Sequence, residues 1–129
     1  YVPSYVLTVS RLQRCLNMKI MTGLQGEKTR WQDELKHFKV ESIFLNNLCS
    51  QAFKKEVDKL IADLEKQENA LDEYGMFLDR SFDSFSALDF ELFLECHGKN
   101  AKKMRELSER FNKFKVICKR MAFKNFAVY

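Results

Sequence analysis

Residues that break helices are rare in this chain. Its 129 residues include one proline and four glycines, so few positions force a helix to end. Apolar residues recur at three- and four-residue spacing over long stretches, and no stretch shows the alternation typical of a β-strand. The sequence therefore predicts an all-α protein with long helices and no internal repeats.

The composition indicates one folded domain that covers residues 1–129. Hydrophobic residues make up 46% of the chain and charged residues 31%, which is typical of a globular protein and not of a disordered one. No apolar run is long enough to span a bilayer. Because the chain begins at Tyr1 and not at Met, we expect either a mature secreted product or a trimmed chain.

Two long helices are expected in the first half of the chain. The first runs from Ser4, which can act as an N-cap, to about Phe38, and Gly23 and Gly26 mark either a bend or a close approach of another helix. Its first apolar stripe consists of Tyr5, Val9, Leu12, Leu16 and Ile20. The second helix runs from about Glu41 to Asn69, and the two would pack as an antiparallel hairpin.

Shorter helices are expected in the second half. Residues 71–86 are expected to be interrupted at Gly75, and the helix from Ala87 to Cys96 is expected to end near Gly98. One or two further helices follow between Asn100 and about Met121. The predicted fold is a compact all-α bundle of about five helices, built on a long antiparallel two-helix hairpin.

Charge divides the chain into two unequal parts. Lys99 to Lys124 contains ten basic residues and two acidic ones, a net charge of +8. Glu56 to Glu95 contains twelve acidic residues and three basic ones, a net charge of −9. The basic segment also carries many aromatic residues, and this combination favours contact with an anionic membrane or an acidic partner. Nucleic acid is not expected as a partner, because no recognised motif is present and the acidic segment would repel phosphate.

The basic segment has two interpretations. Four apolar residues at helical spacing can pack against the hairpin while the lysines face water. These four residues are Phe111, Phe114, Ile117 and Met121. Other apolar residues, Val116 among them, fall off that face, and an exposed apolar patch bordered by cations indicates a membrane or protein contact. The residues expected to make this contact are Lys113, Lys115, Lys119, Arg120, Phe123, Lys124, Phe126 and Tyr129.

No sequence motif indicates catalysis. The chain lacks a nucleophile motif, a phosphate-binding loop and a dinucleotide fingerprint, so we expect no enzyme and no cofactor. His37 and His97 are expected to be partly exposed surface residues. The four cysteines are Cys15, Cys49, Cys96 and Cys118. Their spacing does not fit a metal site, and the even number is compatible with two disulfides or with four buried thiols.

One segment of the chain resembles a known family. Residues 16–31, LNMKIMTGLQGEKTRW, are similar to a pattern in the abalone acrosomal sperm proteins, which include sperm lysin and its fusagenic paralogue. The shared elements are Leu16, Ile20, Met21, Gly23, Leu24 and Trp31. Tyr1-Val2, and the Phe93-Leu94 pair before Lys99-Asn100, are similar to further family positions. The resemblance implies a compact bundle of about five helices, secretion through the sperm acrosomal granule, and action without enzymatic turnover.

Within this family the chain is more similar to the fusagenic paralogue. Sperm lysin binds an egg vitelline-envelope glycoprotein through dense tracks of arginine, whereas this chain has seven arginines opposed by 18 acidic residues. The resemblance therefore implies a secreted gamete protein that binds and perturbs membranes at the sperm–egg contact surface and promotes fusion during fertilization. The alternatives are a lysin-like protein that opens the envelope without catalysis, and an intracellular helical scaffold with an acidic partner. A homodimer is compatible with the sequence, which does not define the oligomeric state.

Overall fold

The chain forms three long helices. The computed structural model describes residues 4–48, 53–80 and 87–127. Helix α1 spans Ser4–Leu48, α2 spans Lys54–Arg80 and α3 spans Ala87–Ala127. The prediction of an all-α fold is confirmed for these ranges, which contain no strand. The predicted count of about five helices is wrong, and so is the hairpin of residues 4–38 and 41–69, because α1 continues past residue 41.

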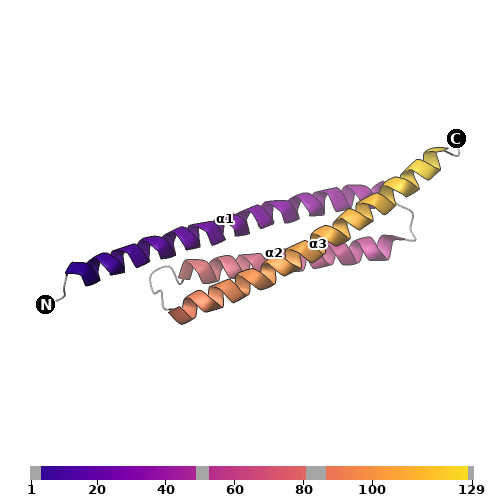
Figure 1. Ribbon diagram of the computed structural model, residues 1–129. Helices are drawn as coiled ribbons and strands as arrows, with labels where there is room; N and C mark the ends of the chain where they lie inside the picture. Colours follow the sequence, from indigo (N-terminus) through magenta and orange to yellow (C-terminus); the bar gives the residue numbers. More distant parts are fainter. Residues whose placement is uncertain (1–3, 49–52, 81–86, 128–129) are drawn as a thin grey trace.

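The helices pack side by side as an elongated bundle (Figure 1). Helices α1 and α3 run in the same direction, and α2 runs in the opposite direction along both of them. The start of α1 extends beyond the ends of α2 and α3, and the end of α3 extends beyond the other end of the bundle. The two termini therefore lie at opposite ends of the molecule.

Each helix packs one stripe of residues at alternating spacings of three and four, and most of its positions are buried; Lys28, His97 and Asn100 are partly exposed members. The stripe of α1 contains Met21, Leu24, Trp31, Leu35, Phe38, Ser42 and Leu45. The stripe of α2 contains Val57, Leu60, Leu64, Gln67, Leu71, Tyr74 and Leu78, and that of α3 contains Phe93, Met104, Leu107, Phe111, Phe114 and Cys118. This heptad spacing is the pattern of a coiled coil, and it explains why the helices stay nearly parallel over their whole contact.

The buried residues form two clusters along the bundle. The larger extends from Trp31 to Cys118 and includes the stacked rings of Phe38 and Phe111, whose centroids lie 4.6 Å apart. The smaller lies toward the start of α1 and contains Phe93, whose ring meets that of Phe77 edge-on at 4.8 Å. A layer of polar residues lies where the two clusters meet.

The interruptions predicted at Gly75 and Gly98 are wrong. Both residues lie inside helices, and no described glycine has a positive φ. A glycine inside a helix costs about 1 kcal/mol relative to alanine. Burying one large apolar side chain gains about 1.5–3 kcal/mol, and α3 buries Phe93 and Met104 on the two sides of Gly98. The apolar stripe therefore carries the helix through the glycine.

Gly75 makes room for a side chain from α1. A Cβ atom at this position would lie 2.9 Å from the Nζ atom of Lys28. Lys28 occupies the heptad position between Leu24 and Trp31, where an apolar residue would normally stand. The absence of a side chain at Gly75 lets the lysine cross the surface of α2.

The first apolar stripe of α1 does not pack as expected. Leu12 and Leu16 are 61% and 55% exposed, although their spacing predicted an inward face. Ile20 alone of the described members packs against the smaller cluster. The physical reason is that α2 and α3 end before they reach this part of α1 (Figure 1). None of the described helices is long and apolar enough to cross a membrane.

Candidate functional site

Two of the cations predicted to contact a partner lie on the outer face of α3. Lys113 and Arg120 are both exposed. Val116 and Ile117 stand between them on the same side of the helix and are 48% and 38% exposed. We call these four residues the α3 basic face. It combines exposed apolar and cationic side chains, as a surface that binds anionic membranes requires.

The burial of the neighbouring apolar residues agrees in part with the sequence analysis. Phe111 and Phe114 are buried in the larger cluster, and Met121 is half-buried. The prediction that Ile117 packs inward is wrong, because the heptad spacing gives the next core position to Cys118. Val116 is exposed, as its position off the packed face predicted.

A third predicted cation, Lys115, faces α1. The Nζ atom of Lys115 donates to Glu41 at 2.8 Å and lies 5.9 Å from the centre of the Phe111 ring. This hydrogen bond holds the pKa of Glu41 below its ordinary value, and the charges of His37 and Lys119 lower it further. Lys115 therefore holds α3 to α1, whereas the side chain of Lys119 is exposed.

The remaining predicted contacts are four residues at the C-terminal end of the chain. Residues 123–127 belong to the last turns of α3, but the side chains of Phe123, Lys124 and Phe126 lie outside the described residues. Tyr129 also lies outside the described ranges.

A groove of about 320 Å³ lies between α2 and α3, next to the α3 basic face. Its lining includes the apolar residues Leu60, Phe114 and Ile117. The exposed cations Lys59 and Lys113 border it together with one exposed carboxylate, that of Glu56. An apolar floor with cations at the rim can accept an anionic amphiphilic group.

A third cation of this groove has a local partner. Nη1 of Arg110 donates to Oδ2 of Asp63 at 2.7 Å. This hydrogen bond lowers the pKa of the Asp63 carboxyl. Arg110 therefore joins α3 to α2 and contributes less free charge to the groove than Lys59 and Lys113 do.

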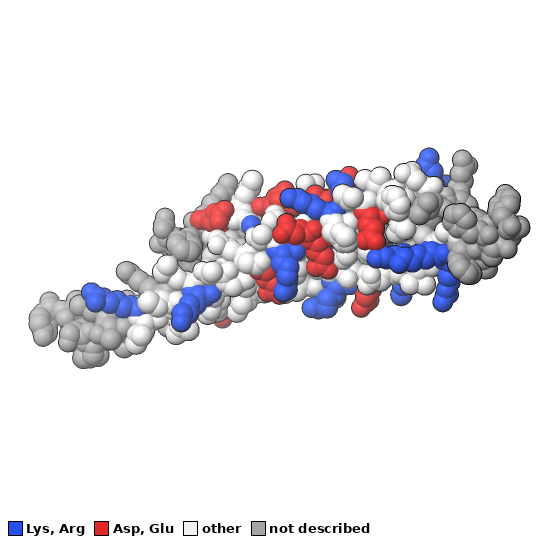
Figure 2. Space-filling model, turned by 90° about the horizontal axis from the view of Figure 1, so that it is seen from above, with Lys and Arg blue, Asp and Glu red and all other residues white. Residues whose placement is uncertain are grey.

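The acidic residues are confined to the central part of the chain. All 18 lie between Glu27 and Glu109, so the first 26 and the last 20 residues contain none. Because α1 and α3 run in the same direction, these acid-free segments lie at opposite ends of the bundle (Figure 1). Figure 2 shows acidic side chains over the middle of one face, while the charged side chains visible toward both ends are basic. The net charge of the C-terminal segment indicated one basic end but gave no sign of the other.

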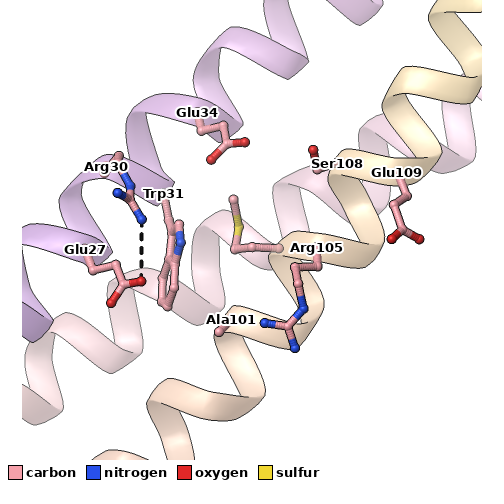
Figure 3. Close-up of a pocket in the computed structure, with 9 residues that line it drawn as sticks. Glu27, Arg30, Trp31, Glu34, Ala101, Arg105, Ser108 and Glu109 are labelled. Carbon is pink, nitrogen blue, oxygen red and sulfur yellow. Dashed lines mark hydrogen bonds and ion pairs between the residues drawn. The ribbon is translucent and has the colours of Figure 1, made fainter.

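A second recess, of about 430 Å³, lies between α1 and α3 (Figure 3). Trp31 projects into it from α1, and Arg105 and Glu109 border it on α3. Glu27 and Arg30 form an ion pair at its edge, with 3.5 Å between Oε1 and Nη2. The lining carries acidic and basic groups in nearly equal number, so it has no preference for one sign of ligand charge.

His97 joins all three helices. It is partly exposed, as predicted, but it lies between the helices and not on the open surface. Its side chain is 14% exposed, and its ring stacks on Trp31 with 4.7 Å between centroids. Nε2 lies 2.7 Å from Oε2 of Glu27, and Nδ1 lies 2.9 Å from the hydroxyl of Tyr74. Burial raises the pKa of Tyr74, and the nearby Cys96 and Glu27 raise it further, so its hydroxyl stays protonated as a donor.

The pair of Gln67 and Asn100 continues this polar layer. Nε2 of Gln67 donates to Oδ1 of Asn100 at 3.0 Å, and Nδ2 of Asn100 donates to the backbone oxygen of Cys96 at 3.0 Å. The sequence signal for this layer is the replacement of apolar residues by Gln67, His97 and Asn100 within the heptad stripes of α2 and α3. Such polar core positions typically fix the register of packed helices.

The cysteines differ in state. Cys118 is disulfide-bonded, and Cys15 and Cys96 are free. Two disulfides are therefore excluded, and so are four buried thiols, since Cys15 is exposed. Cys49 lies outside the described residues. Within the described ranges no group of three His, Cys, Asp or Glu residues could hold a metal ion.

Comparisons with protein families, curated proteins and solved structures found no match for the chain.

Proposed function

We propose that this protein is a non-enzymatic protein that binds anionic membranes through the α3 basic face. The observation that carries this proposal is the exposure of Val116 and Ile117 between the cations Lys113 and Arg120. An apolar pair in this position can enter the headgroup region while the cations meet lipid phosphates.

The energetic contributions favour a reversible contact. Each Lys or Arg near an anionic membrane surface contributes about 1 kcal/mol. Lys113, Lys119 and Arg120 are exposed, and no acidic residue follows Glu109. The partial insertion of Val116 and Ile117 adds a favourable free energy of similar size, because it removes apolar surface from water. Binding should therefore weaken with salt, because surface charges are screened over about 8 Å at physiological ionic strength.

The proposed biological role is fusion of sperm and egg membranes by a protein secreted from the acrosome. The resemblance of residues 16–31 to the abalone acrosomal sperm proteins supports this role. The disulfide at Cys118 supports secretion, because disulfides persist mainly in oxidising compartments. The three helices differ from the bundle of about five that the resemblance implied.

Binding to vesicles tests the proposal. Vesicles of phosphatidylcholine with phosphatidylserine should co-sediment with the protein, and vesicles of phosphatidylcholine alone should not. Val116→Ser with Ile117→Ser should weaken binding about tenfold, which corresponds to about 1.4 kcal/mol. Met76→Ser, at a residue 61% exposed on the acidic helix α2, is the matched control and should bind like the wild type. Equal binding by all three proteins would contradict the assignment to α3.

The second candidate is a lysin-like protein that binds an egg-coat glycoprotein. The observation that favours it is the groove beside the α3 basic face, where Lys59 and Lys113 border an apolar floor. Dissolution of isolated egg envelopes, without binding to phosphatidylserine vesicles, would support this candidate over membrane binding.

A further inference from the structure

We propose that the start of α1 is a second membrane contact, so that the protein tethers two anionic bilayers, one at each end. This inference rests on the proposed function of the α3 basic face at the opposite end. It gives the protein a further activity, the docking of one membrane onto another.

The start of α1 presents an apolar and basic face that no part of the described bundle covers. Leu12, Leu16 and Lys19 follow one another at spacings of four and three, so they share one side of the helix. The two leucines are 61% and 55% exposed, and Lys19 is exposed beside them. Arg11 is also exposed and lies one residue before Leu12. We call these four residues the α1 basic face.

The positive charge of the start of α1 favours an anionic binding partner. Residues 1–26 contain Arg11, Arg14 and Lys19 and no acidic residue. Within the bundle, some cations are neutralised by carboxylates from neighbouring helices, as Lys115 is by Glu41. The start of α1 extends beyond the ends of α2 and α3 (Figure 1), and among the described residues neither Arg11 nor Lys19 forms an ion pair.

A second copy of the chain fits this face less well than a bilayer does. Two copies that paired through it would place like charges opposite one another, which is destabilising in packed helices. A stable protein interface also buries about 800 Å² on each partner. Among the described side chains here, the exposed apolar ones are Leu12, Leu16 and Met18, and these three fall well short of that area. A bilayer needs only shallow insertion of such residues together with attraction to its headgroups.

The two basic faces are far enough apart to meet different membranes. Leu12 precedes Glu41 by 29 residues in one helix, which is about 44 Å at 1.5 Å per residue. Glu41 in turn contacts Lys115, within the segment that carries the α3 basic face. This separation is several times the screening length of about 8 Å at physiological salt. Figure 2 shows acidic side chains over the middle of one face, and these disfavour lying flat with that face on a single anionic surface.

Vesicle docking tests the tether. Donor- and acceptor-labelled vesicles of phosphatidylcholine with phosphatidylserine should give energy transfer between vesicles when the wild-type protein is added. Leu12→Ser with Leu16→Ser should lower the docking rate about tenfold, the change expected when two leucines no longer insert. The same variant should still co-sediment with vesicles through α3, and Met76→Ser should dock like the wild type. All these positions are exposed, so circular dichroism should show that each variant keeps its helices.

The possible failures are distinct. If the wild type does not bind the vesicles at all, the proposed function fails together with the tether. If it binds but docks no vesicles, or if docking is unchanged in the Leu12 and Leu16 variant, the tether alone is overturned. A lipid-free dimer that this variant abolishes in analytical ultracentrifugation would instead assign the α1 basic face to a second copy.

Discussion

The apolar layers around Leu107 and the polar layer around His97 join the same three helices in different ways. Leu35, Leu64 and Leu107 have no exposed surface, and each helix contributes one of them. At His97 the helices are joined by hydrogen bonds to Glu27 and Tyr74, and the imidazole is 14% exposed. The first region gains stability from burial, whereas the second gains directional contacts that only one alignment of the helices satisfies.

Glycines beside the polar layer add to this difference in stability between the two regions. Gly26, Gly75 and Gly98 directly adjoin Glu27, Tyr74 and His97 in the sequence. Each helical glycine weakens its helix by about 1 kcal/mol relative to alanine. The polar layer is therefore flanked by the weakest helical segments of the bundle, and its backbone amides should exchange hydrogen faster than those around Leu107.

The largest effect is expected from Leu107→Ala in the apolar region. Removing a fully buried leucine side chain leaves a cavity and should lower the free energy of unfolding by about 2–5 kcal/mol. Urea denaturation followed by circular dichroism measures this loss. Leu92→Ala, at a residue 42% exposed in the same helix, is the control and should cost less than half as much. Equal losses would mean that the buried stripe does not dominate stability.

A smaller effect is expected from Tyr74→Phe in the polar layer. The phenyl ring keeps the packing, but Nδ1 of His97 loses the hydroxyl that lies 2.9 Å away. Leaving such a partly buried group without its partner costs about 1–2 kcal/mol. A loss as large as that of Leu107→Ala would show that the two regions contribute equally.

The stability of Tyr74→Phe should also differ from that of the wild type at alkaline pH. The pKa of Tyr74 is raised in the folded protein above its ordinary value of 10.0, mainly by burial. A raised folded pKa contributes stability that is present below pH 10 and is lost as the pH rises above it. The wild type should therefore lose stability above pH 10 more steeply than Tyr74→Phe does, in urea denaturation across that range. Parallel pH profiles would contradict the burial of this hydroxyl.

The next effect is a gain of stability at the glycines. A Cβ atom at Gly26 or Gly98 would meet nothing within 4 Å, so Gly26→Ala and Gly98→Ala should each raise the free energy of unfolding by about 0.5–1 kcal/mol. Gly75→Ala is the contrasting variant, because its Cβ would lie 2.9 Å from Nζ of Lys28. It should gain less, since the lysine has to move. Thermal unfolding measures all three, and a loss at Gly98 would contradict its open surroundings.

The same positions explain what the sequence could predict about the fold. Helical spacing correctly predicted the helical class and the burial of Phe111 and Phe114. Local rules for glycine wrongly predicted helix ends at Gly75 and Gly98, because they take no account of the heptad stripe that continues on both sides. The exposure of Leu12 depends on where α2 and α3 end, and no property of residues 4–20 encodes that.

The candidate site was predictable to a similar degree. The net charge of residues 99–124 correctly indicated a basic segment in α3. It could not separate Lys113, which is exposed, from Lys115, which meets Glu41 more than seventy residues away in sequence. The role of His97 also depends on contacts with two other helices, Glu27 on α1 and Tyr74 on α2. Such long-range partners leave no local signature beyond a polar residue at a heptad position.

The smallest effect is expected from Glu41→Gln at the edge of the apolar region, and it depends on acidic pH. The pKa of Glu41 is lowered in the folded protein below its ordinary value of 4.5, chiefly by the hydrogen bond from Lys115. A lowered folded pKa contributes stability that is present above pH 4.5 and is lost as the pH falls through the folded value. Glu41→Gln should therefore flatten the loss of stability below pH 4.5. At neutral pH it should cost less than about 1 kcal/mol, because both partners are partly exposed. Urea denaturation between pH 3 and pH 7 measures both effects, and a neutral-pH cost as large as that of Tyr74→Phe would place this ion pair among the principal contacts between the helices.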